Sequence, residues 1–315
     1  MADNQNQATA SQVASIANAD IDSLLAKTEK FINTMYVIRD SFSLIPDKEH
    51  IGTCINRADL LEMRDDFVRE LVLTVVRWVY SKEKESALLK EFEEGREPSA
   101  AGTLLYKRAV NKFRQSNLKG QFSELLLANL LQHYFKAVPL LRKMPITTNP
   151  ELERNGADAI HISREGDTYR LFLGEAKTYG GASPGRLKPA LKEAVKDILE
   201  KYRNHRTELD LYVFEDFIPS ELEHLARSYL EGTLDNIEIH LVCIVTYEMH
   251  DIPSGSNRQD ILNKIMDCIR KESVGLKDAR EFRDIPAQLY PRINYIIFPV
   301  QGLDDLIDSF KGQLV

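Results

Sequence analysis

The chain has 315 residues, of which 43% are hydrophobic and 28% charged, with 15 glycines and 12 prolines. This length suits one large domain or one domain with an added lobe, and the composition excludes a collagen-like, low-complexity or wholly disordered protein. The 41 basic and 48 acidic residues give a net charge of −7, which argues against a protein that coats nucleic acid through its overall charge.

Neither a membrane anchor nor a disulfide framework is visible in the sequence. No apolar run approaches the roughly 20 residues needed to cross a bilayer, and the first residues lack the basic and apolar regions of a secretory signal. Cys54, Cys243 and Cys268 lie far apart and do not form the paired spacing of a zinc site. We therefore expect a cytoplasmic protein with reduced thiols.

Hydrophobic periodicity divides the N-terminal part into a tail and a helical lobe. Residues 1–12 are polar without any period and are interpreted as a disordered tail. Apolar residues at three- and four-residue intervals predict a helix over residues 16–45 and another over 57–80, whose β-branched end is equally compatible with a strand. Residues 82–97 predict a charged, solvated helix that ends before Pro98. These elements place a helical N-terminal lobe at 13–98.

The remainder, residues 99–315, predicts an α/β domain. An apolar helix at 122–131 precedes three extended segments at 137–146, 157–164 and 169–177. After them the pattern predicts, in order, helices at 184–202 and 220–230, a strand at 237–246, a helix at 260–270, a strand at 295–300 and a final helix from 303. This order of helix, three strands, helix and strand is typical of a mixed sheet flanked by helices.

Residues 99–146 are strongly basic, with eight lysines and arginines against a single acid, Glu124. Such a window is either the solvated face of two helices or a track for a nucleic-acid backbone. Tyr106 and Phe113 lie within it and are candidates either for stacking on bases or for the core. The predicted phosphate contacts of this window are Lys107, Arg108, Lys112 and Arg114.

The segments 157–164 and 169–177 predict a β-hairpin around the turn Gly166-Asp167. A two-residue turn at that position sets a pairing in which Asp158 lies opposite Glu175. Side chains of directly opposed residues share one face of the hairpin, with Cβ atoms about 4.5–5.5 Å apart. The sequence therefore predicts two neighbouring carboxylates.

Two carboxylates at this separation repel each other unless a cation binds between them. Lys177 shares the face of Glu175 because side chains alternate along a strand with a period of two. Phosphodiester hydrolysis needs this set, since hard oxygen ligands hold Mg²⁺ or Mn²⁺ while a nearby amine orients water and offsets charge on the phosphate. The expected metal ligands are Asp158, Glu175 and the carbonyl of Ala176, with Glu124 as a further carboxylate at the rim.

The arrangement resembles the PD-(D/E)xK nuclease superfamily over roughly residues 120–214, with Ala157 in place of the proline in the superfamily's name. The segment 173–179, followed by an alanine-rich helix, is similar to the HamA/AbpA-type nuclease subunits of the Hachiman anti-phage defence system. The resemblance implies a restriction-endonuclease-like core, a catalytic amine at Lys177 and a helix acid at Glu124. It also implies a helicase partner that restrains or delivers the nuclease.

The sequence thus predicts a Mg²⁺- or Mn²⁺-dependent deoxyribonuclease with little sequence specificity. Arg186, Lys188 and Lys192 open the helix after the second hairpin strand and are expected to contact DNA, although a solvated helix surface explains them equally well. A catalytically inactive DNA- or helicase-binding module of the same fold stays open as an alternative. A glycosidase would also use two carboxylates about 5 Å apart, but Lys177 and the basic window disfavour it.

Overall fold

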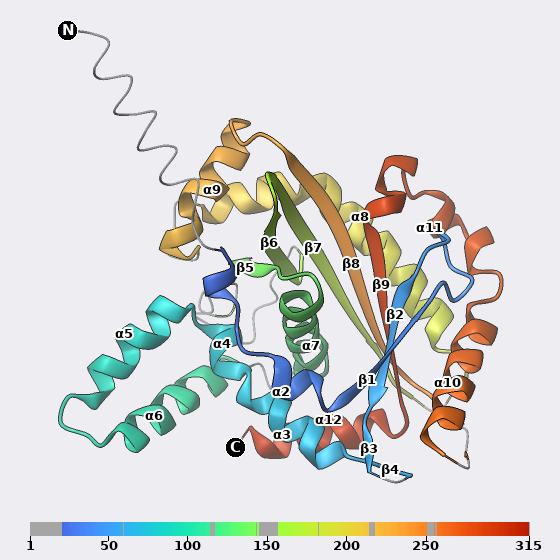
Figure 1. Cartoon of the computed structure of the whole chain (residues 1–315), viewed down its shortest axis with the longest axis horizontal. Coiled ribbons are helices and arrows are strands. Elements are labelled where there is room, and N and C mark those ends of the chain that lie inside the picture. Colours follow the sequence, from blue (N-terminus) through green and yellow to red (C-terminus); the bar gives the residue numbers. More distant parts are fainter. Residues whose placement is uncertain are drawn as a thin grey trace, which may run out of the picture.

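A computed structural model describes residues 21–58, 60–113, 117–142, 144, 157–181, 183–213, 218–250, 255 and 257–314. At its centre lies a seven-stranded mixed sheet with the strand order β1-β2-β9-β8-β7-β6-β5, flanked by helices (Figure 1). A separate two-stranded ribbon pairs β3 (Arg57–Ala58) with β4 (Leu61–Glu62). The predicted α/β class is confirmed.

The sheet combines antiparallel and parallel parts. At one end, β5 (Val138–Leu141), β6 (Ala159–Glu165) and β7 (Thr168–Tyr179) are antiparallel neighbours. In the middle, β7, β8 (Ile237–Glu248), β9 (Ile293–Val300) and β2 (His50–Ile55) run parallel, and β1 (Met35–Asp40) closes the other end antiparallel to β2. The central strands read as nearly continuous apolar runs because both of their faces are covered.

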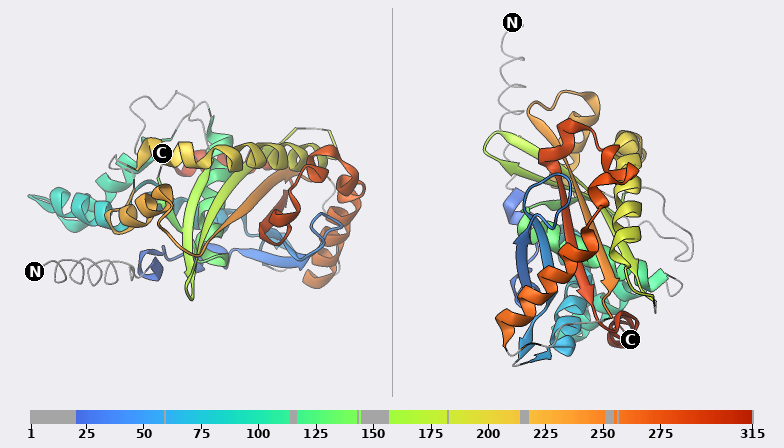
Figure 2. Two further views of the ribbon diagram at one scale, coloured as in Figure 1. Left: turned by 90° about the horizontal axis from the view of Figure 1, so that it is seen from above. Right: turned by 90° about the vertical axis from the view of Figure 1, so that its right-hand side faces the viewer.

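Each face of the sheet has its own hydrophobic core. One face is covered by α7 (Leu118–Tyr134), together with α3 (Arg64–Leu73) and α12 (Leu303–Gln313). The other carries the long helix α8 (Leu187–Tyr212), which lies along β7 and β8 in Figure 2. Around α8 lie α9 (Ser220–Glu231), η4 (Leu276–Asp278), η5 (Ala287–Arg292), α10 (Arg258–Ser273) and α11 (Arg280–Arg283).

A helical hairpin projects from the end of the molecule near β5 (Figure 1). It consists of α5 (Lys82–Glu93) and α6 (Pro98–Val110), which pack on each other, and α6 also contacts α4 (Val75–Val79). Pro98 is the first residue of α6, a position where its missing N–H is not needed. The predicted helix at 82–97 is confirmed, with its end at Glu93.

Alternation along β7 separates the two cores. Leu171 and Leu173 face α8, whereas Phe172 faces α7. Gly174 belongs to the α7 face, where an added Cβ would lie 2.7 Å from Leu127 Cδ2 and 2.9 Å from Ala159 Cβ. The glycine therefore allows α7 to approach the sheet closely, and Glu175 falls on the α8 face.

Most of the predicted elements are confirmed, but the helix expected over residues 16–45 is wrong. The described part of that range forms η1 (Ile21–Leu24), the single turn α2 (Glu29–Ile32) and strand β1. Strand β1 pairs with β2, whose residues are all buried, so tertiary pairing outweighs a weak helical period. Strands β1 and β2, assigned above to a helical lobe, thus belong to the sheet.

The order α7, β5, β6, β7, α8 and β8 matches the predicted order of helix, three strands, helix and strand, with α9 as an added helix before β8. The helix expected over 57–80 is wrong at its start, where β3 and β4 form the two-stranded ribbon. The rest of that segment is α3 and α4, so its β-branched end is helical. Within the described ranges, none of the helices has the length and apolar character that a membrane span requires.

Candidate functional site

The β6–β7 hairpin has the predicted pairing. Glu165 pairs with Thr168 around the turn, where Gly166 adopts a φ of +58°, and the same pairing continues to Ala159 opposite Gly174. Because glycine lacks a Cβ, it adopts this left-handed conformation without strain. The paired residues of β6 and β7 end there, and the predicted direct pairing of Asp158 with Glu175 is not formed, because the Asp158 N–H bonds to Gly174 instead.

Asp158 lies directly before β6 and is fixed by the backbone of β7. Its N–H donates to the Gly174 carbonyl at 3.0 Å, and its carboxylate Oδ2 accepts a hydrogen bond from the Ala176 N–H at 2.8 Å. The preceding N–H, of Ala157, donates to the carboxylate of Glu208 on α8 at 2.9 Å. These bonds leave Asp158 Oδ1 facing α8.

Three side chains of β7 point at α8 and meet three of its side chains. Glu175, Lys177 and Tyr179 recur every second residue, or about 6.6 Å. On α8, Glu193, Asp197 and Lys201 recur every fourth residue, or about 6 Å. Since the two elements run in opposite directions and the repeats nearly match, the following contacts form: Tyr179 to Glu193, Lys177 to Glu193 and Asp197, and Glu175 to Lys201.

Lys177 is held by three carboxylates. Its Nζ lies 2.6 Å from Asp197 Oδ2, 3.1 Å from Glu193 Oε1 and 3.2 Å from Glu175 Oε1. Burial alone would lower the pKa of Lys177, but the hydrogen bonds and charges of Asp197, Glu175 and Glu193 outweigh it and raise the pKa. Lys177 is therefore an ammonium group at neutral pH.

Lys201 lies on the other side of Glu175. Its ammonium donates to Glu175 Oε2 and lies 3.6 Å from Asp158 Oδ1. The Glu175 side chain is 3% exposed, and this burial, followed by the charge of Asp158, raises its pKa despite Lys201 and Lys177. A buried carboxyl with a raised pKa beside a second carboxylate is typical of functional sites.

We call Asp158, Glu175, Lys177, Glu193, Asp197 and Lys201 the acidic cluster. Its carboxylates outnumber its ammonium groups by two, so it carries an excess of negative charge that a divalent cation would neutralise. The described residues contain no group of three His, Cys, Asp or Glu side chains placed to hold a metal ion. The ligands expected from the sequence, the carboxylates of Asp158 and Glu175 and the Ala176 carbonyl, are hard oxygens of the kind that Mg²⁺ and Mn²⁺ prefer.

A family model described as HamA matches residues 15–314. The chain belongs to the HamA family. HamA is a component of the Hachiman defence system, and the match spans both cores of the fold. A search of curated proteins found no match. The predicted resemblance to HamA-type proteins is thus confirmed at the level of the family.

In this HamA-family chain, Glu124 lies on α7, which covers the opposite face of the sheet from α8. It is a half-buried residue of α7. The preceding residue, Ser123, hydrogen-bonds with Thr178 and Thr246 on the α7 face of the sheet. Because the cluster occupies the α8 face, the structure brings together Asp158, Glu175 and Lys177 but places Glu124 on a helix across the sheet.

The predicted DNA contacts fall into two separate groups. Lys107 and Arg108 are exposed on α6, where Arg108 lies over the ring of Phe92 at 4.5 Å. Lys112 is half-buried and Arg114 lies outside the described residues. Phe113 is buried against Trp78 and Phe310, which supports the core interpretation for this aromatic residue.

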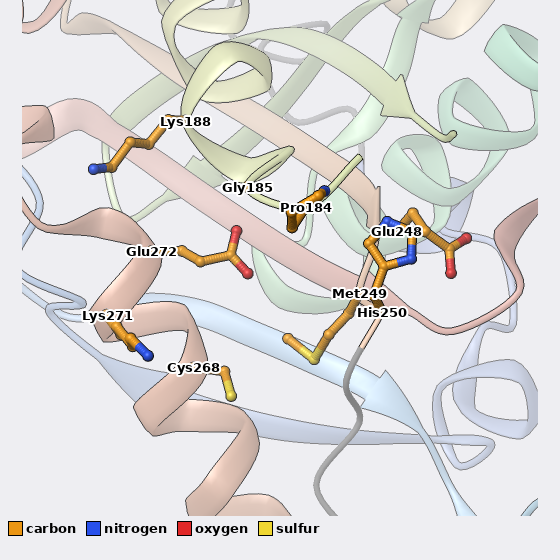
Figure 3. A pocket seen from close by; sticks show the side chains of 9 residues that line it. All are labelled: Pro184, Gly185, Lys188, Glu248, Met249, His250, Cys268, Lys271 and Glu272. Atoms are coloured by element: carbon orange, nitrogen blue, oxygen red, sulfur yellow. The ribbon is translucent and has the colours of Figure 1, made fainter. Parts of the chain in front are cut away.

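The second group lies at the start of α8, the helix that also carries Glu193, Asp197 and Lys201 of the acidic cluster. Lys188 is exposed, while Arg186 and Lys192 are half-buried. Lys188 lines a cavity of about 390 Å³ together with Lys271 of α10, a cation that the sequence did not single out (Figure 3). The other residues around this cavity are Pro184, Gly185, Glu248, Met249, His250, Cys268 and Glu272.

Sequence reasoning also missed the α8 side of the acidic cluster. Glu193, Asp197 and Lys201 stand at four-residue intervals, which puts them on one face of any helix. This stripe follows the Glu175-x-Lys177-x-Tyr179 alternation in the chain of this HamA-family protein. A helix with charged residues on one face, directly after a strand with charged residues on one face, could have predicted that the two sets of side chains meet.

Proposed function

We propose that this HamA-family protein is a divalent-metal-dependent deoxyribonuclease with a restriction-endonuclease-like PD-(D/E)xK core. The observation that carries the proposal is the end of the β6–β7 hairpin, where the Ala176 N–H fixes the Asp158 carboxylate and the Lys201 ammonium contacts both Asp158 and Glu175. The ammonium of Lys177 completes the residue set at 3.2 Å from Glu175. The order α7, β5, β6, β7, α8 and β8 agrees with the core of that superfamily.

Each residue has a distinct role in this proposal. Asp158, Glu175 and the Ala176 carbonyl would hold Mg²⁺ or Mn²⁺, which supplies a Lewis acid and an acidified water when bound. Lys177 stays charged and offsets the negative charge that develops on the phosphate. Glu193 and Asp197 act through Lys177, because they fix its ammonium on the side of Glu175 away from Lys201.

The α8 face suits a DNA backbone that approaches from the start of the helix. Lys188 lies about three and a half turns before Lys201, roughly 20 Å along α8, so this cation and the cluster are carried by the same helix. We propose the basic residues of α6 as a second contact, for DNA or for a helicase partner. Contacts of this kind orient the backbone without reading sequence, which fits cleavage with little sequence specificity.

The direct test is cleavage of supercoiled plasmid by the purified protein with Mg²⁺ or Mn²⁺. Glu175→Gln and Asp158→Asn remove charge at nearly constant shape and should reduce the cleavage rate by at least about 100-fold. The matched control is Glu165→Gln, an exposed acid at the far end of the same hairpin, which should leave the rate unchanged. Equal rates for wild type and Glu175→Gln would reject the site.

The same preparation tests the binding-only alternative and the role of Glu124. A protein that binds labelled DNA but does not cut it under any metal condition, alone or with a co-purified helicase, would be a binding module of this fold. Glu124→Gln should lower cleavage only if its carboxylate reaches the rim of the site from α7. An unchanged rate would remove Glu124 from the catalytic set.

A further inference from the structure

The ammonium of Lys201 lies between the two carboxylates that would bind metal. It donates a hydrogen bond to Glu175 Oε2 and stands 3.6 Å from Asp158 Oδ1. Lys177 instead contacts the other oxygen of Glu175, at 3.2 Å. Of the two lysines in the acidic cluster, Lys201 is therefore the one that faces both acids.

We propose that Lys201 is a built-in counter-ion of the metal position, which holds Asp158 and Glu175 together in the metal-free protein and withdraws when a divalent cation binds. The inference rests on the proposed function, because it takes these two carboxylates as the metal ligands. It assigns a role to a residue of α8 that the hairpin motif does not include.

Electrostatics explains why Lys201 is needed without metal. Two ionised carboxylates at neighbouring positions of a hairpin repel each other, and the low exposure of Glu175 weakens screening by water. An ammonium between them replaces that repulsion with two attractions. The charge of Asp158 and Glu175 is thereby neutralised in part while the hairpin keeps the geometry that a cation requires.

Electrostatics also explains why Lys201 must withdraw. A divalent ion binds carboxylate oxygens at about 2.0–2.6 Å, which is inside the space that the ammonium occupies, and the two cations repel. The Lys201 side chain is 19% exposed and has a flexible four-carbon stem, so a path to solvent is open to it. Lys177 is less free to move, because Glu193 and Asp197 also hold it.

Competition of this kind sets the metal concentration at which the site fills. Replacing Lys201 by a neutral side chain should tighten metal binding, because nothing has to be displaced. Replacing it by arginine should weaken binding, since a planar guanidinium can pair with both carboxylates at once and is harder to remove.

The test is calorimetric titration of Mn²⁺ into the purified full chain, without DNA. Lys201→Met should lower the Kd on the order of tenfold, and Lys201→Arg should raise it. Lys196→Met, an exposed lysine on the same helix, is the matched control and should bind Mn²⁺ like wild type. If Lys201→Met does not fold, the arginine variant still decides, because binding as tight as in wild type would overturn the proposal.

Asp158→Asn separates this proposal from the proposed function. When Asp158→Asn abolishes Mn²⁺ binding and Lys201→Met binds no more tightly than wild type, the counter-ion role is wrong while the metal site stands. When wild type and Asp158→Asn give the same titration, the metal site itself is wrong and both proposals fall. Tighter binding by Lys201→Met together with weaker binding by Lys201→Arg supports the role proposed here.

Discussion

Substituting Gly174 by alanine tests how the α7 face of the sheet supports the acidic cluster on the α8 face. The added methyl group would lie 2.7 Å from Leu127 Cδ2 and 2.9 Å from Ala159 Cβ. The leucine methyl is the end of a side chain and can rotate, but the Ala159 Cβ moves only with the backbone of β6. Overpacking of this kind costs about 1–3 kcal/mol, offset in part by about 0.4–1 kcal/mol from the lower entropy of the unfolded alanine chain.

We therefore expect Gly174→Ala to lower the free energy of unfolding by about 1–2 kcal/mol. Urea denaturation followed by the fluorescence of the only tryptophan, Trp78, measures it. Gly102→Ala is the matched control, because Gly102 lies within α6 and a methyl group added there would meet no atom of the described residues within 4 Å. The control should stabilise the protein by about 0.5–1 kcal/mol.

A double-substitution cycle sharpens the test. Leu127→Ala alone removes a fully buried side chain and should cost about 2–5 kcal/mol. Combined with Gly174→Ala, the new methyl occupies part of the vacated space, so the joint loss should be smaller than the sum by about 1 kcal/mol or more. Additive losses would refute the close contact between α7 and β7 from which the prediction is made.

Three further predictions follow from the charges of the fold. Burial lowers the pKa of His50 to about 4, so as the pH falls below about 6.5 the unfolded chain takes up a proton that the folded chain does not. His50 should therefore destabilise the fold by about 1.4 kcal/mol for each pH unit of acidification from 6.5 towards 4, and His50→Gln should reduce the pH slope by that amount in denaturation at several pH values. Added Mn²⁺ should raise the Tm of wild type but not of Asp158→Asn in a thermal melt, and an equal rise in both would place the ion elsewhere. In DNA-binding titrations over a range of salt, Lys188→Glu should weaken binding and flatten the salt dependence, as should Lys107→Glu if α6 lies in the footprint; an unchanged slope removes the residue from it.

The His50 prediction depends on its hydrogen bonds as well as on burial. Its Nε2–H donates to the Pro46 carbonyl at 3.1 Å, and its Nδ1 accepts from the Tyr295 N–H at 3.3 Å. These partners fix a neutral ring, since protonation of Nδ1 would set two N–H groups against each other. Glutamine retains one donor and one acceptor without titrating, so it isolates the proton from the packing.

Local patterns predicted the hairpin and the helices around it. The Gly166-Asp167 step fixes a two-residue turn, and this turn fixes the pairs from Glu165–Thr168 to Ala159–Gly174. Asp158 could therefore be placed near Glu175 from the sequence, although the direct pairing stops one residue earlier. The helical repeats of α7 and α8 are long and strongly periodic, and such segments are the easiest to predict. Their ends were less accurate, since α8 continues to Tyr212.

Features that depend on distant partners could not be predicted in this way. Strand β1 needs β2, and β2 in turn pairs with β9, which follows more than two hundred residues later. Lys201 reaches Glu175 only because the repeats of α8 and β7 match when the helix lies along the strand. The face occupied by Glu124 depends on which side of the sheet α7 covers, and hydrophobic periodicity carries no information about that choice.

The position of β9 also has a consequence for biosynthesis. This strand lies between β2 and β8, so the β1–β2 hairpin has no neighbour in the sheet until the last part of the chain leaves the ribosome. The segment from α7 to β8, which contains the residues proposed to cut DNA, is translated earlier. Its strands β5, β6, β7 and β8 are neighbours of one another in the sheet. A nascent chain stalled before residue 293 would thus hold these residues beside an open β8 edge, and completion of translation would close the sheet.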